Sequence, residues 1–237
     1  MTQALEGRNV LVTGGTGALG TAVVQAFVHA GARVTVSWVV ERERDALREE
    51  LGAAAKRVKL ERADVTDPDA VAALCVTATE PTGRLDVLAQ LVGGFAFAPI
   101  TETEPKTWHK MIALNATSTF LCAREAVKCM RPHGGRIVTV AAVPAVARGA
   151  ANMSAYAAAK AAVLNLTQSL SKEVVGDGIT VNAIVPSTID TPANRAAMPD
   201  ADTATWLAPA AIAEVVLWLA GEAAGIVTGT EVMLSKG

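Results

Sequence analysis

The chain is poor in the residues that build disulfides and metal sites. Its 237 residues include three cysteines, Cys75, Cys122 and Cys129, which form no CxxC pair and cannot all pair with one another. Buried, reduced thiols in a cytoplasmic protein are therefore favoured over a disulfide framework. The three histidines are scattered without the spacing of metal ligands, and we predict no metal site.

Charge and long apolar runs are also scarce. Charged residues make up 19% of the chain, the formal net charge is −2, and no basic run occurs, so we expect no nucleic-acid or membrane partner. The start, MTQALEGRNVLVTGG, lacks the charged region, apolar core and cleavage site of a secretory leader. Later apolar stretches, such as AIAEVVLWLAGEAAGIV, are interrupted by charge too soon to span a bilayer. These features predict a globular cytoplasmic protein.

Apolar, β-branched runs alternate with helical patterns along the whole sequence. Strands are expected at 9–13, 33–39, 57–65, 85–92, 136–142, 179–185 and 230–234, with helical patterns in the intervals between them. Near-continuous hydrophobic strands separated by helices indicate a parallel sheet covered on both faces. We therefore predict a doubly wound (Rossmann) α/β fold, with a mostly parallel seven-stranded sheet in a single domain over 1–237.

A glycine-rich turn, VTGGTGALG, follows the first expected strand. Gly15, Gly17 and Gly20 match GxGxxG, and Gly14 with the last two matches TGxxGxxG. Glycines at these places permit a tight turn and let backbone amides approach a pyrophosphate at the start of the next helix. At a first strand–helix junction the pattern predicts dinucleotide binding. The expected contacts are Gly14, Gly15, Thr16, Gly17, Ala18, Leu19 and Gly20.

The end of the second strand bears on the choice between NAD and NADP. An acidic residue there would hold the ribose diol of NAD, but the strand ends in Ser37 and Trp38, with Glu41 only at the next helix. Arg42 and Arg44 are placed to meet a 2′-phosphate, with Ser37 as a hydroxyl donor. The alternative is that both arginines belong to a solvated, charged helix face. We expect NAD(P)H as the cofactor, with a slight preference for NADP and with Ser37 and Arg42 among its contacts.

The only tyrosine, Tyr156, lies in the stretch SAYAAAK, four residues before Lys160. On a helix this spacing places both side chains on one face. A free phenol has a pKa near ~10, and a neighbouring ammonium favours the phenolate, which lowers that pKa. The pair is therefore suited to proton transfer, whereas the alternative is an ordinary helix with a packed tyrosine and a solvated lysine.

The glycine turn and the YxxxK pair together resemble the short-chain dehydrogenase/reductase family. Four further segments support the resemblance: ADV (63–65), LDVLAQLVGG (85–94), LNATSTF (114–120) and VNAIVPSTIDTP (181–192). The resemblance implies an NAD(P)-dependent oxidoreductase in which Tyr156 is the catalytic acid/base. Lys160 would hold the nicotinamide ribose and lower the phenol pKa, and Asn115 would position a water in the proton relay.

The resemblance also implies further contacts and an assembly. The cofactor contacts that it adds are Asp64, Val65, Gly93, Gly94, Tyr156, Lys160, Pro186, Thr188, Ile189 and Thr191. A homodimer or homotetramer is expected, and the alanine-rich outer faces of the helices at 152–173 and 208–220 suit contact between subunits.

The chain departs from the family pattern where a serine usually polarises the substrate carbonyl. Ala141 and Ala142 stand at the matching places in RIVTVAAVPAV. Either the substrate needs no serine, or catalysis is lost and the chain is a dinucleotide-binding sensor or scaffold. The segment VPSTIDTPANRAAMPDADTATW resembles the dihydropteridine reductase branch of the family, whose conjugated pterin substrate needs no serine. The same-class alternative is a reductase or dehydrogenase acting on another carbonyl or alcohol.

A small-molecule substrate would meet residues close to the expected nicotinamide position. The candidate contacts are Phe95, Phe97, Ala142, Met153 and Trp206, although apolar residues at such places often serve packing instead. The segment 187–207 is longer than most strand–helix connections and contains several prolines, which suits a lid over the site. The alternative is a rigid surface loop.

Overall fold

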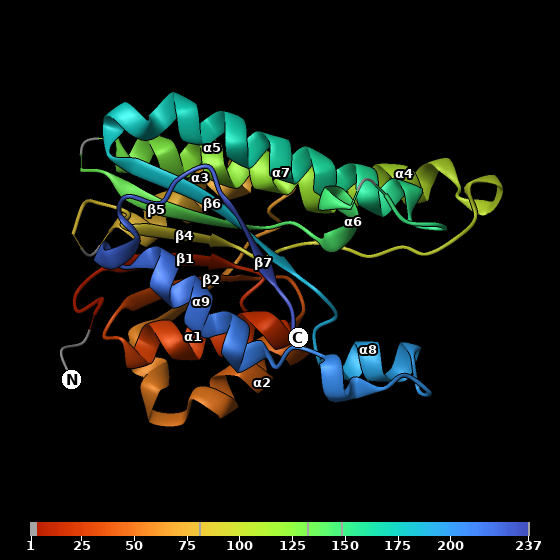
Figure 1. Cartoon of the computed structure of the whole chain (residues 1–237). Coiled ribbons are helices and arrows are strands. Elements are labelled where there is room, and N and C mark those ends of the chain that lie inside the picture. The colour runs from red at the N-terminus through yellow and green to blue at the C-terminus, as the bar shows by residue number, and fades with distance from the viewer. Residues whose placement is uncertain (1–3, 81, 132, 148, 237) are drawn as a thin grey trace.

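The computed structural model describes residues 4–80, 82–131, 133–147 and 149–236. Seven strands form one parallel sheet in the order β3-β2-β1-β4-β5-β6-β7, which confirms the predicted doubly wound fold (Figure 1). The strands are β1 (Asn9–Thr13), β2 (Arg33–Trp38), β3 (Val58–Arg62), β4 (Val87–Gln90), β5 (Gly135–Val140), β6 (Ile179–Pro186) and β7 (Glu231–Leu234). The chain adds strands outward from β1 to β3 and then reverses direction at β4. In sheets of this kind, ligands bind at such a reversal, which here lies at the carboxyl ends of β1 and β4.

Helices cover both faces of the sheet. One layer contains α1, α2 and α9, and the other contains α3, α5 and α7, with α4 and α6 beside them (Figure 1). The helices are α1 (Ala18–His29), α2 (Glu41–Leu51), α3 (Pro68–Thr79), α4 (Pro105–Met111), α5 (Ser118–Met130), α6 (Val143–Val146), α7 (Ser154–Val174), α8 (Pro192–Ala197) and α9 (Pro209–Ala220). Short 3-10 turns occupy Gly52–Arg57, Ile100–Glu102, Val175–Asp177, Thr203–Thr205 and Glu222–Ala224.

The hydrophobic core lies between the sheet and each helix layer. Every residue of β1, β4 and β6 is buried, as expected for central strands of a covered parallel sheet. On one face Val12 and Val36 pack with Phe27 of α1, and on the other Leu11 and Leu88 pack against α3 and α5. A separate apolar cluster therefore packs the helices against each face of the sheet. Together the two clusters hold the strands, and with them the strand ends, in fixed relative positions.

Local sequence signals account for several helix boundaries. The Asp67 side chain accepts a hydrogen bond from the backbone N–H of Asp69, and Pro68 is the first helical residue of α3. α1 begins differently, because Gly17 at its N-cap supplies no side-chain acceptor. The first N–H groups of α1 therefore remain available to a ligand.

Two features were not anticipated from the sequence. The helical region before Met130 is interrupted by a π-helix at Ile112–Thr117, which carries Asn115. The segment 187–207 contains α8, a 3-10 turn and an isolated bridge between Ile189 and Leu207, so it is structured and not an open loop.

In the described part of the chain, no helix is long and apolar enough to cross a membrane.

Candidate active site

The glycine turn is packed so tightly that side chains would not fit at several positions. Gly14 has φ +69°, and a Cβ built there would lie 2.9 Å from the backbone nitrogen of Val92. A Cβ on Gly15 would lie 2.6 Å from the Val36 side chain, and one on Gly20 would collide with the Gly14 carbonyl oxygen. Glycine is required here by space as well as by backbone angle. Gly17, by contrast, is exposed and nearly free of neighbours.

This turn fits a dinucleotide pyrophosphate. It delivers the uncapped start of α1, a 12-residue helix, to the carboxyl edge of the sheet, where the helix dipole is positive. The seven turn residues expected from the sequence lie together here. One neighbour was not foreseen: the Thr16 hydroxyl donates to a carboxylate oxygen of Glu43 on α2, at 3.2 Å.

The end of β2 carries the residues that the sequence suggests for the adenosine end of the coenzyme. Trp38 ends β2 with 9% of its surface exposed, and the Arg44 guanidinium lies 4.6 Å from the centre of its ring. Asp45 orients that guanidinium through a 2.7 Å ion pair. The other two residues that the sequence suggests are placed differently: Ser37 is buried within the sheet, and Arg42 is exposed. Of Ser37, Arg42 and Arg44, only Arg44 has its charged group held against the end of β2, through its contact with Trp38.

Asn115 and Lys160 converge beside Gly93, just beyond the end of β4. A Cβ on Gly93 would lie 2.7 Å from Asn115 Oδ1 and 3.2 Å from Lys160 Nζ. Asn115 is fully buried, and its amide is fixed by Gly94, whose N–H donates to Oδ1 at 3.2 Å and whose carbonyl accepts from Nδ2 at 3.1 Å. The π-helix turns Asn115 toward the sheet edge, so the loop at Gly93–Gly94 and the two predicted catalytic side chains form one cluster.

Tyr156 and Lys160 lie one turn apart near the start of α7. Lys160 is 6% exposed, and its ammonium donates to the Val140 carbonyl at 2.7 Å, at the end of β5. The Tyr156 ring meets the Phe95 ring edge-on, with 5.0 Å between centroids and 74° between planes. The contact fixes the tyrosine ring against the loop that follows β4.

Burial controls the ionisation of both groups. It raises the pKa of Tyr156 to about 12 and lowers the pKa of Lys160 to about 8. The direction for Tyr156 is opposite to the lowering expected from its lysine neighbour. The physical reason is that removing the phenol from water disfavours the phenolate. The group is therefore a neutral phenol at physiological pH.

The substrate side of the cluster is apolar. Ala142 follows β5 with 5% exposure, and it offers no hydroxyl where the family pattern has serine. Phe95 and Phe97 are exposed, at 62% and 59%, whereas Trp206 is only 5% exposed and is therefore mainly a packing residue. Met153 is half-buried immediately before α7. Phe95 is thus the candidate in direct contact with Tyr156.

The remaining predicted contacts also lie beyond strand ends. Pro186 is buried at the end of β6, and Thr188 and Ile189 follow it half-buried. The Thr191 hydroxyl accepts from the Asn194 N–H at 3.1 Å and so caps α8. After β3, Asp64 is exposed and accepts from the N–H and hydroxyl of Thr66, and Val65 is buried. The structure brings these residues to one edge of the sheet.

A buried hydrogen-bond chain beneath the site was missed by sequence reasoning. The Thr13 hydroxyl donates to Gln90 Oε1, and Gln90 Nε2 donates to the Ser118 hydroxyl at 3.0 Å. Ser118 in turn donates to the Leu114 carbonyl in the π-helix, at 2.7 Å. The chain links the strand before the glycine turn to the segment that carries Asn115. The signal for it was Gln90 itself, a polar residue inside an apolar strand.

Comparison with known proteins identifies the family. The family model described as short chain dehydrogenase matches residues 8–202. A cis-4-hydroxycyclohexanecarboxylate dehydrogenase of Sinomonas cyclohexanicum is 36% identical, over 100% of this chain and 98% of its own length. A 3-alpha-(or 20-beta)-hydroxysteroid dehydrogenase of Mycobacterium bovis is 32% identical, over 100% and 91%. A cyclic-di-GMP-binding biofilm dispersal mediator protein of Escherichia coli is also 32% identical, over 95% and 94%.

Solved structures agree with the family match. The crystal structure of a dehydrogenase/reductase from Sinorhizobium meliloti superposes with a TM-score of 0.87 at 29% identity, over 98% of this chain and 95% of that one. A short chain dehydrogenase from Mycobacterium smegmatis gives a TM-score of 0.86 at 31% identity, over 99% and 94%. The glycine turn, the fold and these matches together show that the chain belongs to the short-chain dehydrogenase/reductase family of NAD(P)-dependent oxidoreductases.

Proposed function

We propose that the chain reduces a small cyclic molecule with NAD(P)H and that Tyr156 donates the proton. The observation that carries the proposal is the cluster of Tyr156, Lys160 and Asn115 at the sheet edge that also presents the glycine turn. The coenzyme supplies the hydride. The protein then has to hold the acceptor beside it, exclude water and provide one proton.

Each of the three side chains has a separate task in this proposal. Tyr156 is kept neutral by burial, which suits a proton donor. Lys160 is held by the Val140 carbonyl, and its remaining N–H groups would hold the ribose of the coenzyme. Asn115 uses its amide to fix the Gly94 backbone, and it would position a water that replenishes the proton of Tyr156.

Two substrate classes are supported by different observations. The absence of a hydroxyl at Ala142, the flat surface of Phe95 and the DTPANRAAMPDAD segment favour a conjugated ring such as a quinonoid dihydropterin. The names of the Sinomonas and Mycobacterium relatives favour an alicyclic secondary alcohol or its ketone. An assay of NADH and NADPH consumption against quinonoid dihydropterin and a panel of cyclic ketones separates the two.

The variant Ala142→Ser sharpens that assay. A restored hydroxyl would stabilise the oxyanion that develops from a ketone, so ketone reduction should rise in the variant if a ketone is the substrate. The added hydroxyl does not help the reduction of a quinonoid ring, so the rate of that reaction should fall or stay unchanged. Turnover of neither class by the wild type, with coenzyme bound, would contradict the proposed enzyme.

The different-class alternative is a dinucleotide-binding sensor. It is supported by Ala142 and by the Escherichia coli relative, whose name records ligand binding and no reaction. The enzyme is favoured because Asn115 and Lys160 lie together beside Gly93, with Tyr156 one helical turn before Lys160. A sensor would bind coenzyme and show no substrate-dependent oxidation of it with any member of the panel.

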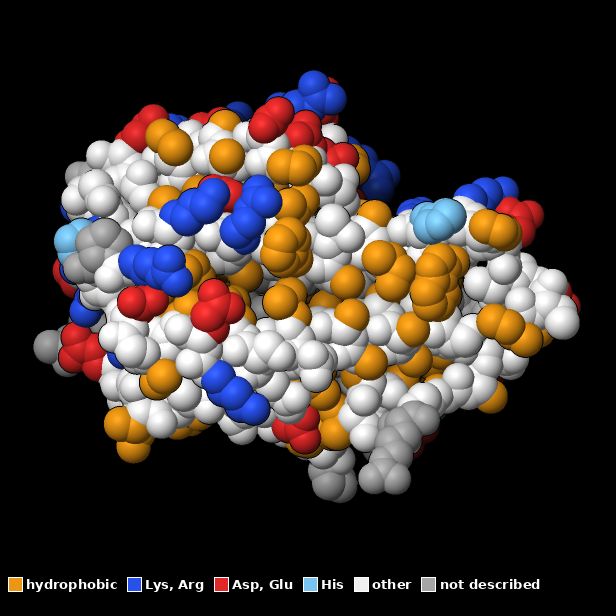
Figure 2. All heavy atoms as spheres, turned by 90° about the horizontal axis from the view of Figure 1, so that it is seen from above, with side chains coloured by type: hydrophobic (Ala, Val, Ile, Leu, Met, Phe, Trp, Pro, Cys, Tyr) orange, Lys and Arg blue, Asp and Glu red, His pale blue; other side chains and the backbone are white. Residues whose placement is uncertain are grey.

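Cofactor preference, location and assembly complete the proposal. We place NADP ahead of NAD because Arg44 is held at the end of β2, where no carboxylate ends the strand. Because the thiols of Cys75 and Cys122 are buried and the chain requires NAD(P)H, we place the protein in the cytoplasm. We propose a homodimer or homotetramer, since hydrophobic side chains spread across the face formed by α4, α5 and α7 (Figure 2).

A further inference from the structure

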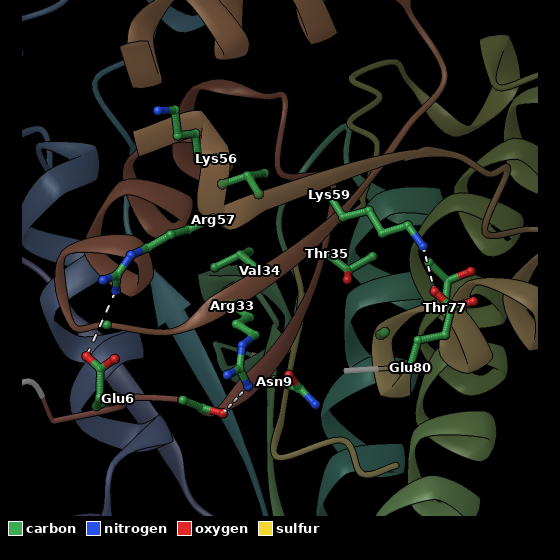
Figure 3. Close-up of a pocket in the computed structure, with 14 residues that line it drawn as sticks. Glu6, Asn9, Arg33, Val34, Thr35, Lys56, Arg57, Lys59, Thr77 and Glu80 are labelled. Carbon is green, nitrogen blue, oxygen red and sulfur yellow. Dashed lines mark hydrogen bonds and ion pairs between the residues drawn. The ribbon is translucent and has the colours of Figure 1, made fainter. Parts of the chain in front are cut away.

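A cavity lies at the opposite edge of the sheet from the candidate active site. It has a volume of about 510 Å³, within the range of small-molecule pockets, and it opens at the amino ends of β1, β2 and β3 (Figure 3). Asn9 and Arg33 are the first residues of β1 and β2, and both line it. The coenzyme turn follows the other end of β1, so the two sites are separated by the length of the sheet.

Positive charge exceeds negative charge around this cavity. Its lining includes four cationic side chains and two carboxylates, namely Arg33, Lys56, Arg57, Lys59, Glu6 and Glu80. The ends of α1 and α3 add roughly half a negative charge each, which leaves a surplus of about one positive charge. This surplus stands out in a chain whose formal net charge is −2.

The cations are not all engaged by carboxylates. Lys59 pairs with Glu80 at 2.7 Å, and Arg57 approaches Glu6 only to 3.9 Å (Figure 3). Arg33 donates to the neutral Gly7 carbonyl at 3.0 Å. Within the described ranges, neither Arg33 nor Lys56 has a carboxylate oxygen within 4.0 Å. Two cations on the rim are thus available to an anion.

The floor of the cavity contains an unsatisfied polar group. Asn9 is 1% exposed, and its Nδ2 donates to Thr82 Oγ1 at 2.5 Å and to the Arg84 carbonyl at 2.9 Å. Its Oδ1 is buried and has no hydrogen-bond partner among the described residues. Such an atom is costly unless a ligand or water donates to it. The hydroxyl-bearing Thr35 and Thr77 line the same cavity.

We propose that this cavity binds a phosphorylated sugar or polyol. The phosphate groups would pair with Arg33 and Lys56 at the rim, and the hydroxyl groups would hydrogen-bond to the threonines and, directly or through water, to Asn9. No aromatic side chain lines the cavity in the described residues, so there is no surface on which a nucleotide base could stack. That lining favours a sugar phosphate over a nucleotide.

The test uses fructose 1,6-bisphosphate as the probe and the whole protein saturated with NADP⁺, so that the glycine turn is occupied. Isothermal titration should show saturable binding of the bisphosphate, weaker binding of inorganic phosphate, and none of fructose. Binding should weaken as ionic strength rises. Arg33→Gln and Lys56→Gln should each weaken the binding of the bisphosphate by roughly five- to tenfold, as expected for the loss of one charged contact.

Arg48→Gln is the matched control, because Arg48 is an exposed arginine on α2 outside the cavity lining. It should leave the affinity unchanged. Both rim side chains are exposed, so the variants should keep the melting temperature of the wild type. Absence of saturable bisphosphate binding, or equal affinity in the wild type and both rim variants, would overturn the site. Neither result bears on the proposed reductase, which is read from coenzyme oxidation.

Discussion

Lys160 is the residue whose environment conflicts most with its charge. Its ammonium is almost completely buried, yet its only hydrogen bond among the described residues is to one carbonyl. A lowering of its pKa from 10.5 to about 8 means that the charged form destabilises the fold at neutral pH. Such strain is typical of a group retained for function.

Replacement of Lys160 by methionine should therefore stabilise the fold while slowing catalysis. We expect the free energy of unfolding at pH 7 to rise by about 1–2 kcal/mol, because a buried charge is exchanged for an apolar chain of similar length. Turnover should fall by at least about tenfold. Urea denaturation and steady-state kinetics measure the two effects. A variant less stable than the wild type would contradict this account.

The same residue predicts a pH dependence. The folded-state pKa of Lys160, about 8, lies below the unfolded value of 10.5, so the unfolded chain binds more protons between these values. The contribution of Lys160 to stability should therefore rise as pH increases from 8 to 10.5. The difference in stability between the wild type and Lys160→Met should shrink across that window. A difference that is constant with pH would show that Lys160 is not strained.

Tyr156 can be titrated directly because it is the only tyrosine. Its folded pKa of about 12 predicts that no tyrosinate absorbance appears below pH ~10 unless the protein unfolds. Unfolding is followed in parallel by circular dichroism. Tyrosinate that forms near pH 8 in the folded protein without coenzyme would restore the original expectation, in which Lys160 lowers the phenol pKa.

Secondary-structure elements were the most predictable level of the molecule. The expected strand at 9–13 matches β1, and the expected helix at 208–220 matches α9 to within one residue, because continuous β-branched runs and helical periodicity are strong local signals. The π-helix at Ile112–Thr117 has no such signal, since it is set by the tertiary contacts of Asn115 with the Gly93–Gly94 loop. The family resemblance therefore pointed to Asn115, which the structure places beside Lys160, but the sequence could not show how Asn115 is held.

The buried chain from Thr13 through Gln90 to Ser118 connects three elements and makes a prediction at that scale. Gln90→Leu leaves two buried hydroxyls short of a partner and should lower the free energy of unfolding by about 1–3 kcal/mol. Ser118→Ala removes the next hydroxyl in this chain of hydrogen bonds. If the chain acts as a unit, the double variant should lose less than the sum of the singles. Additive losses in urea denaturation would show independent contacts.

At the scale of the whole molecule, the sheet separates two sites. The carboxyl edge holds the reductase cluster, and its place could be predicted from the sequence because parallel strands end at one edge. The cavity at the amino edge could not, since its residues come from distant turns and strand starts with no shared motif. The cofactor preference could be predicted only in part from the sequence, because the position of Arg44 over Trp38 depends on how α2 packs.

Assembly is also a property of the whole molecule. Trp108 of α4 and Phe120 of α5 remain 41% and 47% exposed. A second copy would cover them. Phe120→Glu should dissociate the assembly, which sedimentation velocity measures, whereas Ile226→Glu, at an exposed residue beyond α9, tests whether that other face also takes part. A monomeric wild type would contradict the proposed oligomer.

The central claim is that one phenol is held at the reactive ring of a bound coenzyme. The most direct test is a crystal structure of the protein with NADP⁺. The account predicts the pyrophosphate on the Gly14–Gly20 turn, the nicotinamide ribose against Lys160, and the Tyr156 hydroxyl facing the nicotinamide ring. A coenzyme bound elsewhere, or a Tyr156 hydroxyl directed away from that ring, would contradict it.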